Sequence, residues 1–225
     1  MRSPRTGRRG GSGSSRTGRR LLRHDRELGF RYVAGADEAG RGCLAGPLVA
    51  AAVLFDHERL TLSQRRQLTA LNDSKQQTLE AREQLYPVIM RTATKVAVVS
   101  RSVRRIDSVG LHRTNVAALR EALLRVACPG CICLSDGFRV PDTGHEQMHV
   151  IDGDARSAAI AAASIIAKVT RDRYMRRVDE VHNGWGFADH VGYATPEHRA
   201  AIMARGVSPL HRLSFQSIAY QQLEL

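Results

Sequence analysis

Four acidic residues stand where short apolar stretches of the sequence end, and together they could carry chemistry. They are Asp37, Glu38, Asp136 and Asp154. A glycine lies close to each of these three places, at Gly35, Gly137 and Gly153. If the three apolar stretches are neighbouring strands, the four carboxylates converge at one rim of a sheet. Like charges a few Å apart repel and raise one another's pKa, so we expect such a cluster to hold a cation.

The oxygen ligands of this cluster suit a hard ion, Mg²⁺ or Mn²⁺, rather than zinc. Two such ions can activate a water and stabilise the leaving oxygen when a phosphodiester is displaced in line. The spacing therefore indicates metal-assisted chemistry on phosphates. A simpler interpretation is also open, because acids at strand ends and helix N-termini are common as turn formers and caps. Asp154 alone fits a helix cap, and the Asp37–Glu38 pair alone fits a solvated turn.

The surrounding sequence indicates the elements that would position these acids. Short apolar stretches between turn residues predict five strands, at 31–36, 47–55, 95–100, 131–135 and 148–151. Helical spacing of apolar residues predicts helices within 60–94 and at 108–127, 155–182, 196–205 and 214–222. This order of strands and helices predicts an α/β fold with a mixed sheet covered by helices. The first two strands should form an antiparallel hairpin across a loop at 37–46.

The first twenty residues differ in composition from the rest of the chain. Arginine, glycine and serine fill sixteen of these positions, and a segment of this kind buries too little apolar area to fold. We therefore predict a disordered basic tail at 1–28. The remainder is long enough for one main folding unit, which we place at 29–185, with a C-terminal helical appendage at 186–225 packed on it.

Charge and hydropathy narrow the class of protein. The formal net charge is +12, and seven arginines lie within residues 1–20, which contain no acid. A basic excess suits a polyanionic partner such as nucleic acid, although a solvated basic surface is the other interpretation. No stretch approaches the roughly eighteen unbroken apolar residues of a membrane span, so we expect no membrane partner.

The four cysteines give an indication of the cellular compartment. They are Cys43, Cys128, Cys131 and Cys133, and no secretory signal precedes them. This usage is typical of a reducing cytoplasm rather than of a disulfide framework. The stretch Cys128-Pro-Gly-Cys131 resembles half of a zinc knuckle, but no second pair stands at matching spacing, so we expect buried thiols there instead of zinc.

Beyond spacing, the sequence resembles the ribonuclease HII family in six blocks that occur in the family's order. The first block is Ala36-Asp-Glu-Ala-Gly-Arg-Gly-Cys-Leu-Ala-Gly-Pro-Leu-Val-Ala-Ala-Ala-Val53, the second is Asn72-Asp-Ser-Lys75, and the third is Ser135-Asp-Gly137. The fourth combines Gly153-Asp154 with 160–172, and the last two are 190–198 and 208–215. The resemblance covers about residues 29–217 and implies a ribonuclease H-like fold for that part of the chain.

The resemblance implies roles for particular residues. The metal-binding catalytic acids would be the same four residues that their position already suggests: Asp37, Glu38, Asp136 and Asp154. Gly40, Arg41 and Gly42 would contact the 2′-hydroxyl of a ribonucleotide through their backbone, since glycine allows close approach and this hydroxyl distinguishes RNA from DNA. Tyr193 would pack on the sugar of the following deoxynucleotide. Lys75, Lys168 and Arg171 are candidate phosphate contacts, although such side chains on helices are usually solvated.

The activity that follows is endonucleolytic hydrolysis of RNA in RNA/DNA hybrids and at single ribonucleotides in duplex DNA. Two Mg²⁺ or Mn²⁺ ions would assist cleavage on the 5′ side of the ribonucleotide, leaving 5′-phosphate and 3′-hydroxyl ends. We expect a cytoplasmic monomer. Two other interpretations are a different nuclease of the same fold, such as a resolvase or exonuclease, and a non-catalytic nucleic-acid-binding protein with a structural acid cluster.

Three positions depart from the pattern of the family. The family usually has proline at Cys43, lysine at Asp152 and a basic residue at Leu213. Asp152 would add a fifth acid beside the cluster and remove a cation that could meet phosphate. We expect the change at Cys43 to be harmless, and none of the three removes an expected metal ligand.

Overall fold

The computed structural model describes residues 12–72, 77–215 and 220. Its centre is one five-stranded sheet with strand order β3-β2-β1-β4-β5. The strands are β1 (Tyr32–Ala39), β2 (Leu48–Asp56), β3 (Lys95–Arg101), β4 (Cys131–Asp136) and β5 (Glu146–Val150). The pairs β1–β2 and β2–β3 are antiparallel, whereas β1–β4 and β4–β5 are parallel. The predicted mixed α/β sheet with an antiparallel first hairpin is confirmed.

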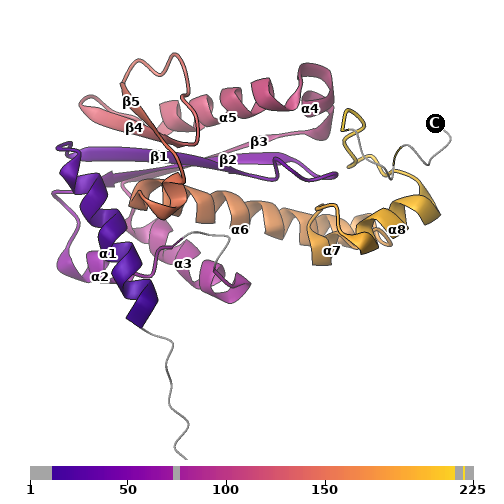
Figure 1. Cartoon of the computed structure of the whole chain (residues 1–225), viewed down its shortest axis with the longest axis horizontal. Coiled ribbons are helices and arrows are strands. Elements are labelled where there is room, and N and C mark those ends of the chain that lie inside the picture. Colours follow the sequence, from indigo (N-terminus) through magenta and orange to yellow (C-terminus); the bar gives the residue numbers. More distant parts are fainter. Residues whose placement is uncertain (1–11, 73–76, 216–219, 221–225) are drawn as a thin grey trace, which may run out of the picture.

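Helices cover both faces of this sheet, as Figure 1 shows. On one face lie α4 (Val103–Val109) and α5 (Leu111–Val126). On the other lie α1 (Ser12–Glu27), α2 (Leu62–Leu68), α3 (Leu79–Thr92) and α6 (Ala158–Val181), the last preceded by the 3-10 turn η1 (Gly153–Ala155). None of the described helices is long and apolar enough to cross a membrane.

Strand β1 is longer than predicted. It continues through Ala39, which is paired with Val49 of β2, so Asp37 and Glu38 belong to the strand and not to the following loop. Successive strand residues face opposite sides of a sheet. Val33 and Ala39 accordingly belong to the apolar core under α6, whereas Ala34 and Ala36 belong to the core under α5.

Helix α6 lies close to the sheet because its first turns carry small side chains. Ala158, Ala159, Ala161, Ala162 and Ala163 are all fully buried in the core of that face. Gly35 of β1 lies directly below Ala159 and Ile160, where even a Cβ atom would come within 2.2 Å of the helix backbone. The sequence thus sets a short distance between the strand that carries Asp37 and the helix that follows Asp154.

The predicted disordered tail is wrong for residues 12–27, which form α1. Leu21 and Leu22 are buried in the main core, and the carboxylate of Asp25, fully buried, accepts a 2.9 Å hydrogen bond from the Ala159 amide. The composition of the first twenty positions gave no sign of this helix because its apolar anchors come after them. Residues 1–11 lie outside the described part of the chain.

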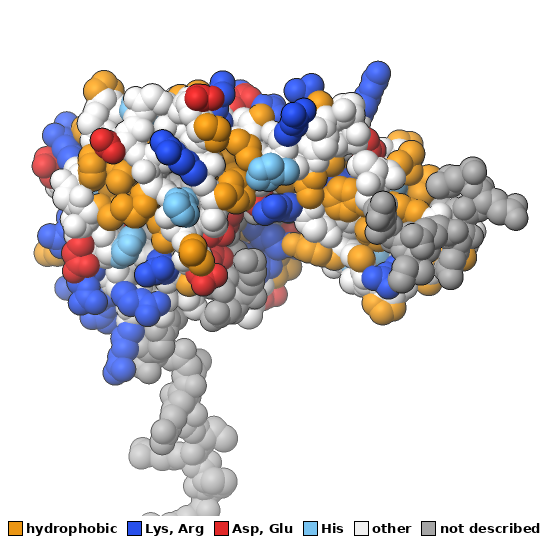
Figure 2. All heavy atoms as spheres, turned by 45° about the horizontal axis from the view of Figure 1, so that its top comes forward, with side chains coloured by type: hydrophobic (Ala, Val, Ile, Leu, Met, Phe, Trp, Pro, Cys, Tyr) orange, Lys and Arg blue, Asp and Glu red, His pale blue; other side chains and the backbone are white. Residues whose placement is uncertain are grey.

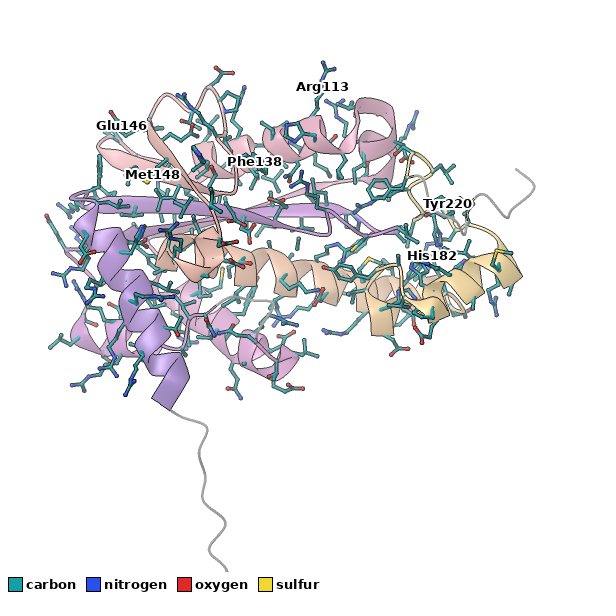
Figure 3. The ribbon with its side chains drawn as sticks, viewed as in Figure 1. Arg113, Phe138, Glu146, Met148, His182 and Tyr220 are labelled. Atoms are coloured by element: carbon teal, nitrogen blue, oxygen red, sulfur yellow. The ribbon has the colours of Figure 1, made fainter. Side chains whose placement is uncertain are left out.

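The C-terminal appendage lies beyond the end of the sheet. Its helices are α7 (Phe187–His190) and α8 (Pro196–Arg205), and it contacts the rest through the last turns of α6 and the loop after β1. Tyr220, labelled in Figure 3, packs there with Leu44 and Ile202. Most of the predicted helix at 214–222 falls outside the described residues.

Candidate active site

Asp37 and Asp136 lie where the pairing between the parallel strands β1 and β4 ends. In the register of β1 and β4, Ala36 pairs with Ser135, so the next residue on each strand is one of these acids. Gly35 and Leu134 stand two positions before these acids and face α6. Because residues two apart on a strand share a face, both carboxylates lie on the face that α6 covers. Two acids 99 positions apart in the sequence are thus brought side by side, as the strand-end argument predicts.

Glu38 leaves β1 on the opposite side from Asp37, yet it remains in the same electrostatic environment. Its backbone amide donates a 2.7 Å hydrogen bond to the Asp37 carboxylate. Its own carboxylate is only 10% exposed and lies 3.8 Å from the guanidinium of Arg41. Arg41 in turn lies over the ring of Phe138, which follows β4 and is labelled in Figure 3.

Asp154 reaches the cluster from the turn η1 before α6. It is 4% exposed, and the neighbouring Gly153 amide donates a 2.6 Å hydrogen bond to the Asp136 carboxylate. The backbone bond ties the end of β4 to the turn that carries Asp154. The alternative role of Asp154 as the cap of the long helix is wrong, since Ser157 caps α6 with its hydroxyl.

Ser164 is a site residue that the sequence argument missed. It lies on α6, is 5% exposed, and its hydroxyl donates a hydrogen bond to the Asp37 carboxylate. A helical serine within an alanine-rich stretch predicts only a tolerated small side chain, so nothing in the local pattern pointed to this contact. Ser164 is a positioning residue for Asp37.

The electrostatics of the site centre on Asp37. Burial raises the pKa of its carboxyl well above the ordinary value, and the nearby charges of Glu38 and Asp136 raise the pKa further. The hydrogen bond from Ser164 acts in the other direction and favours the ionised form. A cation bound at this point would remove the repulsion and restore ionisation of Asp37.

The donor set fits a divalent cation of the hard type, because every candidate ligand is a carboxylate oxygen. Within residues 12–72, 77–215 and 220, however, no three acidic, histidine or cysteine side chains are already grouped tightly enough to hold a metal ion. Asp37, Glu38 and Asp136 share one electrostatic environment without forming a finished cage, and Asp154 is tied to them through the hydrogen bond of the neighbouring Gly153 amide to Asp136. Binding would therefore require them to draw together around the ion.

The loop 40–47 follows β1 and carries the predicted Gly40-Arg41-Gly42 contact. Gly40 has a φ of +91°, and a side chain there would collide with Arg171, so only glycine fits. Gly42 has open space around its Cα, which leaves its backbone accessible. The loop has no regular structure, and its shape depends on contacts from elsewhere in the chain.

Arg171 supplies two of these contacts, to Ala45 and Pro47, and its predicted role as a phosphate contact is wrong in this structure. Its side chain is 1% exposed, and its guanidinium donates to the carbonyl oxygens of Pro47, Val191 and Ala45 at 2.7–2.9 Å. A second buried guanidinium, that of Arg212, donates to Gly46 and Arg41 oxygens at 2.8–3.2 Å. These two arginines hold the loop instead of binding substrate.

Tyr193 and Lys168 lie together beside this loop. The Lys168 ammonium is 5.1 Å from the centre of the Tyr193 ring and also pairs with Asp172 at 2.8 Å. Burial raises the pKa of Tyr193, whose hydroxyl neighbours the buried thiol of Cys43. Lys168 stands one helical turn beyond Ser164 on α6 and so faces the same side as the acids. Lys75, the remaining candidate, lies outside the described residues.

The positions that depart from the family pattern are found around this site. Cys43 is fully buried beside Tyr193, while Asp152 and Leu213 are exposed. All four cysteines are free thiols; Cys131 and Cys133 are buried, and Cys128 is partly so. Cys131 lies 3.7 Å from His145, and, as stated above, the described residues contain no group that could hold zinc.

A five-stranded sheet of order 3-2-1-4-5, with a buried acid on β1 next to a second acid on the adjacent parallel strand, defines the ribonuclease H-like class of nucleases. The model of the family described as ribonuclease HII matches residues 34–218. The chain belongs to the ribonuclease HII family and is, as such, a metal-dependent endonuclease with ribonuclease HII activity.

Curated relatives agree over most of the chain. A ribonuclease HII of Rhizobium johnstonii is 47% identical over 200 residues, which are 88% of this chain and 84% of the relative. One of Mycobacteroides abscessus is 46% identical over 191 residues, 85% of this chain and 80% of that protein.

Solved structures agree in fold. A ribonuclease H2 from Pyrococcus horikoshii superposes with a TM-score of 0.70 at 24% identity, covering 84% of this chain and 95% of that one. A Bst-RNase HIII in complex with Mn²⁺ superposes with a TM-score of 0.67 at 20% identity, covering 88% and 70%. The predicted ribonuclease H-like fold is confirmed.

Proposed function

We propose that this enzyme hydrolyses RNA strands in RNA/DNA hybrids and single ribonucleotides embedded in duplex DNA. Cleavage falls on the 5′ side of the ribonucleotide and leaves 5′-phosphate and 3′-hydroxyl ends. The observation that carries the proposal is the burial of Asp37 next to Asp136 of the adjacent parallel strand, because a buried carboxylate beside a second carboxylate suits cations that meet a phosphate. We also propose that the enzyme acts as a cytoplasmic monomer.

Asp37, Glu38, Asp136 and Asp154 are the proposed holders of two Mg²⁺ or Mn²⁺ ions. Ions of this kind supply Lewis acidity at a phosphate and an activated water. Asp37 lies between Glu38 and Asp136 in the electrostatic environment, so it is the proposed shared ligand. Ser164 holds the Asp37 carboxylate by its hydrogen bond, and the Gly153 amide does the same for Asp136. The acids themselves account for the chemistry, and no histidine is required as a base.

Recognition of the ribonucleotide is proposed for the loop 40–47 and its neighbours. The open backbone at Gly42 suits close contact with a 2′-hydroxyl, and Tyr193, which is 40% exposed, offers a ring face to the adjoining sugar. Lys168 beneath that ring and Arg41 beside Glu38 are the proposed phosphate contacts. The loop 40–47 is hydrogen-bonded to Gly192 and Leu210 of the appendage, which sets the side of the site on which the ribonucleotide is read.

The test is cleavage of three end-labelled duplexes, one with a single ribonucleotide, one full RNA/DNA hybrid and one all-DNA, each with Mg²⁺ and with Mn²⁺. We expect cutting of the first two and none of the third. Asp37→Asn and Asp136→Asn should keep the fold and lower kcat by several orders of magnitude. Asp142→Asn is the matched control, because Asp142 is an exposed acid that pairs with Arg120 on the other face of the sheet, and this variant should cut normally.

Three outcomes would contradict the proposal. Cutting of all-DNA at the same rate would indicate a different nuclease of this fold. Binding of the ribonucleotide duplex without cutting in either metal would indicate a non-catalytic binding protein. Near-normal cleavage by Asp37→Asn or Asp136→Asn would show that the proposed ligands are not the catalytic acids.

A further inference from the structure

A second charged surface lies at the opposite end of the site from the loop 40–47. Helices α1 and α2 enclose an open groove of about 780 Å³, which we call the arginine groove. Seven arginines line it: Arg16, Arg19, Arg20, Arg23 and Arg26 of α1, with Arg65 and Arg66 of α2. The remaining lining residues are Leu22, Leu62 and Thr69, so no acidic side chain among the described residues lines the groove. Figure 2 shows lysine and arginine side chains gathered at this end of the molecule.

The arrangement of these arginines destabilises helix α1 unless an anion is present. Arg16, Arg19 or Arg20, Arg23 and Arg26 follow one another at intervals of three or four, which places them on one helix face. Like charges at this spacing repel by about 0.2–0.5 kcal/mol per pair. The two nearest acids of α1 give little relief, since Asp25 is buried against the Ala159 amide and Glu27 makes only an exposed 3.7 Å pair with Arg23.

The groove is joined directly to the acid cluster. The guanidinium of Arg20 donates a 3.2 Å hydrogen bond to the carbonyl of Ala155, the residue that follows Asp154. The bond between Asp25 and the Ala159 amide fixes the same helix on the first turn of α6. A duplex whose scissile phosphate meets the acids, with its ribonucleotide at the loop 40–47, would therefore extend its other arm over α1.

The dimensions suit a nucleic-acid backbone. From Arg16 to Arg26 the helix rises about 15 Å. Phosphates of one strand follow one another at about 3.4 Å along a duplex axis, so the row spans about four of them. Arginine is also the side chain whose planar group matches phosphate oxygens in pairs.

We propose that the arginine groove binds backbone phosphates of the substrate duplex several nucleotides away from the scissile bond. The inference rests on the proposed function, because it takes the ligand to be the same duplex that the acids cut. The groove contributes affinity without sequence readout, and it favours long duplexes over short ones. Its effect appears in KM and in the salt dependence of binding, and kcat stays unchanged.

The test compares the full chain with a triple variant, Arg16→Gln, Arg23→Gln and Arg66→Gln. All three side chains are exposed, glutamine keeps helix propensity, and Arg20 and Arg65 stay because they hold backbone carbonyls. The matched control changes Arg113, Arg120 and Arg125 of α5 to glutamine, which removes the same charge from the other face of the sheet. Arg113 is labelled in Figure 3 at the outer side of α5.

Binding is measured without divalent metal, so that no cutting occurs, on two duplexes with one ribonucleotide each. The short duplex ends at the cleavage site on the groove side, and the long one extends ten base pairs further. We expect the groove variant to bind the long duplex about tenfold more weakly, with a salt slope shallower by about 2–3, and to bind the short duplex as the parent does. The control triple should match the parent on both.

Equal binding of the long duplex by the groove variant and the control would overturn the proposal and leave the groove to another polyanion, such as an acidic protein. An equal loss of affinity for both duplexes would overturn the proposal as well, because the groove would then not act on the added ten base pairs. Failure of the proposed function is recognised separately, by absence of cutting in the parent enzyme with Mg²⁺ and Mn²⁺. The binding comparison is independent of that result.

Discussion

Replacing Gly35 by alanine should disturb the site through the helix that lies on it. A Cβ atom at this position would lie 2.2 Å from the carbonyl carbon of Ala159 and 2.3 Å from the amide nitrogen of Ile160. Both are backbone atoms, so no side chain can rotate away. Ordinary contact begins at about 3.4 Å, and α6 must therefore move away from β1 by about 1.2 Å.

A displacement of this size affects both stability and catalysis. Overfilling a packed core typically costs about 1–3 kcal/mol of the free energy of unfolding. The same movement takes Ser164 away from Asp37 and shifts the turn that carries Asp154. A misplacement of about 1 Å in catalytic groups can lower turnover about a hundredfold.

The assay combines urea unfolding with cleavage of the single-ribonucleotide duplex. Gly42→Ala serves as the stability control, because nothing lies within 4 Å of its Cβ position and its φ is not in the left-handed region. We expect Gly35→Ala to lose stability and kcat, and Gly42→Ala to keep the parental stability. Parental values of both quantities in Gly35→Ala would refute the conclusion that strand and helix contact sets the site's geometry.

Three further predictions concern pH, metal and the buried arginine. The contribution of His198 and His211 to the free energy of unfolding should be complete above about pH 6.5 and fall as the pH decreases toward 4, because burial lowers the pKa of both to about 4 from 6.5 and the unfolded chain takes up protons first. The expected loss at pH 5 is about 2 kcal/mol for each histidine; urea unfolding at each pH measures it, and a flat profile would contradict it. Mg²⁺ should raise the Tm of the parent but not that of Asp37→Asn, and an equal rise in both would argue against Asp37 as a ligand. Without metal, the Tm of Asp37→Asn should equal or exceed that of the parent, since the substitution removes a buried charge beside two others. Arg171→Met should cost about 3 kcal/mol or more in chemical denaturation, since three buried carbonyls lose their charged donor, and a loss below 1 kcal/mol would contradict this structural role.

The positions of the strands were predictable from the sequence because they depend on local patterns, although β1 continues to Ala39, beyond its predicted end at 36. Apolar stretches bounded by turn residues located β1, β2 and β4, and the parallel register then brought Asp37 next to Asp136. The order of strands and helices was sufficient for the fold class. The close approach of α6 follows from its first turns, which are rich in alanine.

Contacts between distant segments were not predictable in the same way. The hydrogen bond from Ser164 to Asp37 and the three bonds of Arg171 depend on how α6 lies across the sheet, and no local pattern encodes them. Helix α1 was missed for a related reason. Its arginine-rich composition favours a disordered tail, whereas the burial of Leu21, Leu22 and Asp25 holds it in place.

The clamp of Arg212 on the loop 40–47 has a consequence for synthesis of the protein. Its guanidinium holds the carbonyls of Gly46 and Arg41, although 166 positions separate Arg212 from Gly46. A chain leaving the ribosome can form the β1–β2 hairpin early, but it lacks this clamp until nearly its whole length has emerged. The loop 40–47, which we propose to contact the ribonucleotide, should consequently be the last part of the site to acquire its final shape. Premature termination before residue 212 should yield a sheet whose loop lacks this clamp.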